Sequence, residues 1–206
     1  MNLSRSLWPG SLVFFLAVVP ALAGGDLGVA ATVVNSRYCL GPNGAITLDL
    51  TVHFTYRNVG QASVVLPRFS RLSGYTLFRN EGDLRAGRAL TRAVFHWGDI
   101  FDRLRIEPAR PDPMLFEAVQ PGGIAGREDE VTIPVSPERA GGLALLGTSV
   151  LAQFTIDNWP GHKHIEKSRQ VWAQLGTLWA SQDTPPPVPI SIESKPNPVR
   201  CVPRVD

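Results

Sequence analysis

The clearest hydrophobic pattern in the chain is an unbroken alternation within residues 45–67. Six apolar side chains alternate with polar ones over its first half. A period of two places one face of a strand against a core and the other in water. Residues 58–61 (NVGQ) then supply turn-forming Asn and Gly, and residues 62–66 are apolar enough to return as a second strand. The pattern predicts a β-hairpin that ends at Pro67, because proline cannot donate to a ladder.

Several shorter stretches also have the alternation or the composition of strands. They cover residues 30–34, 75–79, 93–97, 130–135, 150–156 and 188–192. In the fifth of these, Val150, Ala152, Phe154 and Ile156 are predicted to share the buried face. Short strands separated by Gly- and Pro-rich segments predict an all-β fold, an immunoglobulin-like antiparallel β-sandwich with long loops.

Two further segments do not follow this pattern. Residues 106–127 are rich in Pro and Gly and are predicted to form a long loop. Residues 164–180 contain apolar positions at helical spacing, followed by Trp and Thr residues that favour a strand. We expect one short helical turn there, followed by a strand over residues 175–180.

The first 23 residues have the features of a secretory signal peptide. Arg5 precedes an apolar stretch from Leu7 to Val19, and a small-x-small site, Ala21-Leu22-Ala23, follows it. The stretch is too short to cross a membrane comfortably and is interrupted by Pro and Gly. We therefore expect a secreted or periplasmic protein without a membrane span, in which residues 24–206 form a single β-sandwich domain.

Only two cysteines are present, Cys39 and Cys201, one near each end of the mature chain. In an exported protein, two such cysteines are expected to form a disulfide. A reactive or metal-binding thiol is the alternative, although neither cysteine has a CxxC partner or a nearby histidine. The disulfide interpretation implies that the two ends of the domain meet in space.

The formal net charge of +2 is small, and it removes two classes of partner from those expected. A near-neutral chain without blocks of like charge gives no electrostatic reason to bind nucleic acid or an anionic membrane. The expected partner is a protein or a glycan of unknown identity.

The hairpin sequence LDLTVHFTYRNVGQASVVL, residues 48–66, resembles bacterial extracytoplasmic immunoglobulin-like modules. Adhesion-type domains related to CARDB and the BsuPI-type proteinase inhibitors have a similar hairpin. The resemblance covers about twenty residues, and it implies a sandwich fold and an accessory or interaction role. It carries over no functional residue.

Motifs for catalysis or for cofactor binding are missing from the sequence. It contains no HExxH, GxSxG, GxGxxG, phosphate-loop or calcium-loop pattern. We therefore assign no catalytic residue and no cofactor, and we expect a protein that is not an enzyme.

One cluster, DNWPGHKHIE, could still bind a metal through His162 and His164. Imidazole nitrogens suit zinc or copper, and two histidines two positions apart on a strand point the same way. His53 or His96 could complete such a site. The neighbouring Pro160-Gly161 instead favours a loop with solvated histidines.

Two other groups of residues have both a functional and a structural interpretation. The mature tryptophans Trp97, Trp159, Trp172 and Trp179 could stack on sugars or anchor a partner, or could plug the core. The acids Asp99, Asp102, Glu107 and Asp112 could act as a glycosidase pair, but interleaved arginines favour surface ion pairs.

Three functions therefore remain open. The first is an interaction module that binds through loops at one end of the sandwich, with residues 106–127 and 158–168 as the longest candidates. The second is a proteinase inhibitor that presents one such loop. The third is a metal-binding or enzymatic protein centred on His162 and His164.

Overall fold

The computed structural model of the protein describes residues 26–41, 44–68, 71–96, 113–136, 144–158 and 165–201. Its strands are β1 (Leu27–Leu40), β2 (Ile46–Asn58), β3 (Val64–Pro67), β4 (Arg71–Phe78), β5 (Thr91–Val94), β6 (Phe116–Val119), β7 (Ile124–Pro134), β8 (Ser149–Asp157), β9 (Thr177–Leu178), β10 (Gln182–Asp183), β11 (Val188–Ser191) and β12 (Val199–Arg200). Within these ranges the helices are α1 (Glu81–Arg85) and α3 (Ile165–Trp172), both short.

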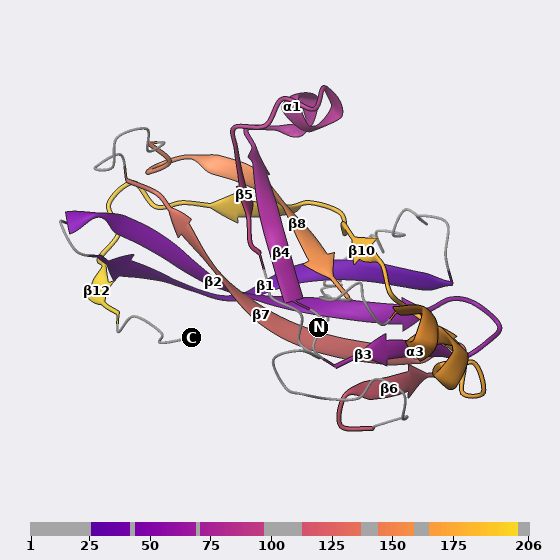
Figure 1. Ribbon diagram of the computed structural model, residues 1–206. Helices are drawn as coiled ribbons and strands as arrows, with labels where there is room; N and C mark the ends of the chain where they lie inside the picture. Colours follow the sequence, from indigo (N-terminus) through magenta and orange to yellow (C-terminus); the bar gives the residue numbers. More distant parts are fainter. Residues whose placement is uncertain are drawn as a thin grey trace, which may run out of the picture.

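The strands form two main sheets that lie in two layers (Figure 1). The first sheet has the order β12-β1-β2-β7, and the second has the order β10-β8-β4-β5, with β11 also paired to β8. A third, small sheet with the order β6-β3-β9 lies at one end, beside α3 (Figure 1). Most strand pairs are antiparallel, whereas β1–β12 and β3–β9 are parallel. The predicted all-β sandwich is therefore confirmed.

One hydrophobic core fills the space between the two main sheets. On β8, Val150, Ala152, Phe154 and Ile156 are all buried, as their alternation predicts. The ring of Phe154 meets the ring of Phe54 from β2 edge to face, with centroids 6.2 Å apart. This contact joins the two layers through side chains that the period-two pattern places inward.

The predicted hairpin over residues 45–67 is wrong in its pairing, although the chain does reverse after β2. Both edges of β2 are occupied, by β1 and by β7. The return strand β3 pairs instead with β6 and β9. The alternation sets which face of β2 is buried, but it does not specify which strand lies beside it. Here the preceding strand β1 occupies one edge and the distant strand β7 occupies the other.

The turn after β2 is held by side-chain hydrogen bonds. The Asn58 side chain accepts from the Gly60 amide at 2.9 Å and donates to the carbonyls of Ala62 and Val119 at 2.8 Å each. Gly60 does not adopt a positive φ. It is needed because a Cβ there would collide with the Asp26 side chain.

The β2–β7 ribbon folds back on itself at this turn. On β7, Arg127 lies opposite Phe54 of β2, and yet its guanidinium donates to the carbonyl of Pro67 at the end of β3. A straight ribbon would separate Phe54 from Pro67 by about 40 Å at ~3.3 Å per residue, far beyond the reach of one side chain. The β3–β6 pair therefore returns alongside the β2–β7 pair.

One other expectation needs correction. The predicted loop over residues 106–127 contains β6 and the start of β7. Phe116 and Val119 of β6 are buried, and Gly122, with a φ of 75°, lies in the tight turn that joins β6 to β7. Residues 106–112 lie outside the described ranges. The polar stretch after β4 contains an additional short helix, α1, whose first turn is capped by the Asn80 side chain accepting from the Asp83 amide.

The mixed segment near the C-terminus folds in the predicted order. Helix α3 precedes the strand β9, although β9 is shorter than the expected residues 175–180. Trp172 from α3 packs on Phe116, with ring centroids 4.6 Å apart, in a second small core beneath the third sheet.

Candidate functional site

The outer face of the second sheet carries an open groove of about 350 Å³. Its floor is β4, and its walls come from β5 on one side and from β8 and β10 on the other. The lining residues are Ser73, Gly74, Tyr75, Thr76, Arg92, Ala93, Val94, Gln153, Thr155, Gln182 and Thr184. The lining is mostly polar, and the volume lies at the lower end of the range for ligand sites.

A β-bulge shapes the floor of this groove. The pairing of β4 with β8 changes register between Leu72 and Gly74. A Cβ at Gly74 would lie 2.5 Å from the carbonyl oxygen of Ala93, so only glycine lets β5 approach β4 so closely. No side chain therefore rises from the sheet at this point of the floor.

Arg92 is the one strongly basic residue among those lining the groove. Its Nε atom lies 3.4 Å from the Thr76 hydroxyl, and the side chain is exposed. Within the part of the chain that the structure describes, no carboxylate forms an ion pair with it. Tyr75 is the other ionisable group, and burial raises its pKa above 10.0, so it is neutral at physiological pH. The groove is therefore positively charged.

A buried polar network supports the β10 wall of the groove. Tyr56 donates to the Asn158 side chain at 3.0 Å, and Asn158 donates to Asp183 at 2.6 Å. Asp183 also accepts from the Trp179 indole at 2.8 Å. Because Asn158 is fully buried and each of its polar atoms is bonded, this network fixes the position of Gln182 beside the groove.

The groove lies near the end of the second sheet at which β5 and β8 both finish. Arg71 at the start of β4 pairs with Asp157 at the end of β8. The Phe95 amide, just after β5, donates to Ser73 at 2.8 Å. The described parts of β5 and β8 therefore both end at this end of the sheet.

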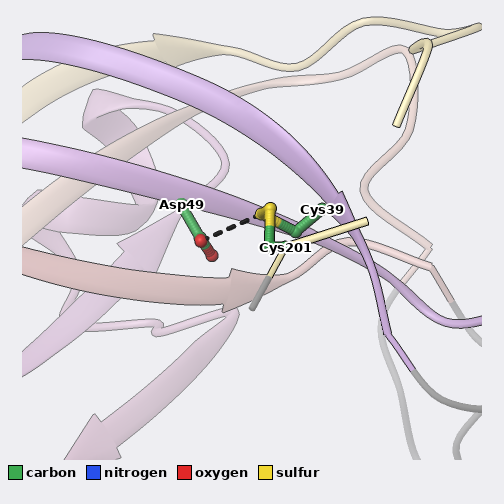
Figure 2. A group of neighbouring side chains, drawn as sticks. All are labelled: Cys39, Asp49 and Cys201. Atoms are coloured by element: carbon green, nitrogen blue, oxygen red, sulfur yellow. Dashed lines mark hydrogen bonds between the residues drawn. A yellow bond between two sulfur atoms is a disulfide. The ribbon is translucent and has the colours of Figure 1, made fainter. Parts of the chain in front are cut away.

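The Cys39–Cys201 disulfide is formed, with Cα atoms 5.4 Å apart, as the sequence predicts. The disulfide joins the end of β1 to Cys201, directly after β12. The strand β12 also pairs with β1 in parallel. The Asp49 carboxylate lies 3.0 Å from the Cys39 sulfur (Figure 2). A disulfide sulfur has no proton to donate, so this contact is a close approach of a negative charge to the bond. The Asp49 carboxylate also accepts a hydrogen bond from the Thr132 hydroxyl at 2.9 Å and lies 3.5 Å from the Arg37 guanidinium.

Cys39, Asp49 and Cys201 are grouped closely enough to hold a metal ion. The two sulfurs could serve as ligands only as thiolates, because metal binding by cysteine requires the deprotonated thiol. In the oxidised protein this cluster is a covalent cross-link. A disulfide is compatible with an extracellular location.

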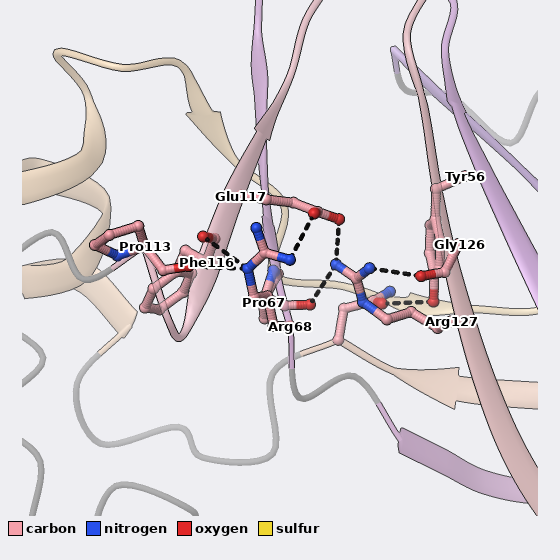
Figure 3. A network of polar contacts seen from close by, with 9 residues as sticks. Tyr56, Pro67, Arg68, Pro113, Phe116, Glu117, Gly126 and Arg127 are labelled. Carbon is pink, nitrogen blue, oxygen red and sulfur yellow. Dashed lines mark hydrogen bonds and ion pairs between the residues drawn. The ribbon is translucent and has the colours of Figure 1, made fainter.

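A second polar cluster holds the folded ribbon together. Glu117 on β6 accepts from Arg68 at 2.9 Å and from Arg127 at 2.5 Å (Figure 3). Arg68 also donates to the carbonyl of Pro113 at 2.9 Å. The side chains of Arg127 and Glu117 are only 14% and 22% exposed. We interpret this cluster as structural, because each charged group already has a partner inside the protein.

The predicted metal ligands His162 and His164 lie outside the described residues, as do Asp99, Asp102, Glu107 and Asp112. His53, considered as a further ligand, lies on β2 beside Glu128 of the neighbouring strand at 3.4 Å. The metal-site prediction thus stays a prediction.

The tryptophans divide in a similar way. Trp97 and Trp159 lie outside the described ranges. Trp172 is 3% exposed and packs in the second core, so the core interpretation holds for it. Trp179 is half-buried and bonded to Asp183.

Sequence reasoning missed the groove. Arg92, Gln153 and Gln182 come from three strands far apart in the sequence, and none belongs to a motif. The available signal was the run of polar residues on the outward positions of β8, where Gln153 and Thr155 alternate with core residues. Such residues are also typical of a solvated sheet face.

No family model, no curated protein and no solved structure matches this chain. No helix in the ranges that the structure describes combines the length and the hydrophobicity needed to cross a membrane.

Proposed function

We propose that this protein is an exported interaction module, which binds a partner at the end of the second sheet where the groove lies. The observation that carries the proposal is the groove itself, in which the exposed guanidinium of Arg92 has no ion-pair partner among the described residues. Loops at one end of a sandwich, held by a rigid scaffold, form a common binding surface.

The chemistry of the groove supports binding rather than catalysis. Its lining contains hydroxyls, amides and one guanidinium, and the described lining residues include no carboxylate or imidazole for acid–base work. The disulfide and the N-terminal signal-peptide pattern support export.

Site-specific photo-crosslinking tests this proposal. A photoreactive amino acid replaces Val94, at the rim of the groove, or Val199 on β12 as a matched control. The two valines are 58% and 55% exposed, so their access to solvent is alike. In the native envelope or secreted fraction, we expect an adduct from position 94 and none from position 199. Equal labelling at both positions, or no adduct at either, would refute the proposal.

A further inference from the structure

The groove and the adjoining strand β5 offer a regular set of contacts for a chain lying along them. Arg92 and Val94 are two positions apart on β5, and both side chains are exposed. Residues two apart on a strand lie roughly 6.6 Å apart on the same face, which equals the repeat of an extended peptide. An extended ligand running along β5 would thus meet both side chains with alternate residues of its own.

The guanidinium of Arg92 selects the charge of this ligand. Its one internal hydrogen bond uses Nε at 3.4 Å from Thr76, which leaves the two terminal nitrogens available to a ligand. The planar fork of a guanidinium matches a carboxylate with two parallel hydrogen bonds. No other charged side chain of the described lining competes for that carboxylate.

The opposite wall has groups that match a peptide backbone. Gln153 on β8 and Gln182 on β10 each carry a side-chain donor and a side-chain acceptor. Gln182 has a long contact of 3.4 Å to Ser73, and Gln153 makes no hydrogen bond through its side chain within the described residues. β5 and β10 are separated by about three strand spacings, roughly 14 Å, which accommodates one extended chain above β4.

We propose that this groove binds an extended peptide segment that places an acidic side chain on Arg92 and an apolar side chain, two positions away, on Val94. The inference rests on the proposed function and names the chemistry of its partner. A peptide is favoured over a glycan because the aromatic ring of the lining, Tyr75, is 5% exposed and cannot stack on a sugar.

Two peptide libraries test this inference on the mature protein. Both are pentapeptides with valine at the first and last positions, acetylated and amidated so that no terminal charge remains. Glutamate occupies the central position in one and glutamine in the other, and small polar residues vary between. Valine on both sides of the centre allows the peptide to run in either direction along β5. Binding is measured by saturation-transfer NMR and calorimetric titration at low salt.

The glutamate library should bind at least about tenfold more tightly than the glutamine library, because glutamine cannot form the charge-assisted bidentate contact with Arg92. Arg92→Gln should remove that difference. Arg57→Gln, which changes an exposed arginine on β2 of the other sheet, should leave it intact. Circular dichroism spectra of both variants check that the fold is retained.

Equal affinity for the two libraries, an unchanged preference in Arg92→Gln, or no binding at millimolar concentration would each overturn the inference. Oligogalacturonate is tested in parallel, and its Arg92-dependent binding without any peptide binding would assign the groove to an acidic glycan instead. If the crosslink from position 94 persists in Arg92→Gln, the proposed interaction function stands and the inference of an acidic ligand is overturned. The two proposals can therefore fail separately.

Discussion

The guanidinium of Arg127 on β7 donates to the carboxylate of Glu117 on β6 at 2.5 Å, across the two arms of one folded ribbon. The Arg127 side chain is 14% exposed, and its Nε atom is buried without a hydrogen-bond partner. The cation therefore depends on Glu117 for much of its compensation.

Glu117→Gln is predicted to lower the free energy of unfolding by about 2–3 kcal/mol, because it leaves a largely buried arginine without its counter-charge. Urea denaturation measures the loss. The matched control is Glu81→Gln on α1, whose i,i+4 pair with Arg85 is 75% exposed on both sides. That variant should lose at most about 0.5 kcal/mol. Equal losses in the two variants would show that the Glu117 cluster does not hold the ribbon.

The Cys39–Cys201 bond closes a sequence separation of 162 residues, which constrains most of the unfolded chain. Replacing both cysteines by alanine is predicted to lower the free energy of unfolding by up to roughly 5 kcal/mol, chiefly through the entropy of the unfolded state. Denaturant unfolding of the variant and of the reduced wild-type protein should give similar losses. A variant as stable as the oxidised protein would contradict this prediction.

The Asp49 carboxylate beside the Cys39 sulfur should slow reduction of the disulfide, because the attacking reductant is an anionic thiolate. Asp49→Asn should therefore be reduced severalfold faster by glutathione. The acceleration should shrink at high salt, which screens the repulsion.

Cysteamine provides the control for this electrostatic effect, since its ammonium group offsets the charge of its thiolate. The Asp49→Asn substitution should accelerate disulfide reduction by cysteamine much less than disulfide reduction by glutathione. The same acceleration with both reductants would mean that the substitution acts by loosening the structure.

How far the sequence predicts this fold depends on which contacts are local. The faces of β2, β7 and β8 follow from alternation, because burial of every second side chain is a property of the strand itself. The disulfide follows from there being just two cysteines. The partners of β2 do not follow from alternation. It pairs with the preceding strand β1 rather than with the following strand β3, and its other partner, β7, is far away in the sequence.

The groove illustrates the same limit. Gly74 looks like an ordinary turn signal in the sequence, and its role becomes visible only when Ala93 of β5 is placed against it. Arg92 is one exposed arginine among many until its lack of a described counter-ion, and its neighbours Gln153 and Gln182, are known. No local pattern brings these three strands together.

Tyr75 gives the stability a predicted dependence on alkaline pH. Burial raises its pKa above 10.0, so the folded state retains the phenolic proton more strongly than the unfolded state does. This contribution is complete below pH 10.0 and is lost as the pH rises through the pKa of the folded state. Urea midpoints across that range should fall more steeply for the wild type than for Tyr75→Phe. Parallel curves would contradict the prediction.

Amide hydrogen exchange on the folded protein, with and without the partner captured at position 94, tests the central claim most directly. The account predicts slower exchange at β5 and along the groove-lining residues of β8, with no change along β1, where Val34 is exposed. Slower exchange confined to β1, with β5 and β8 unaffected, would contradict it and move the binding surface to the other sheet.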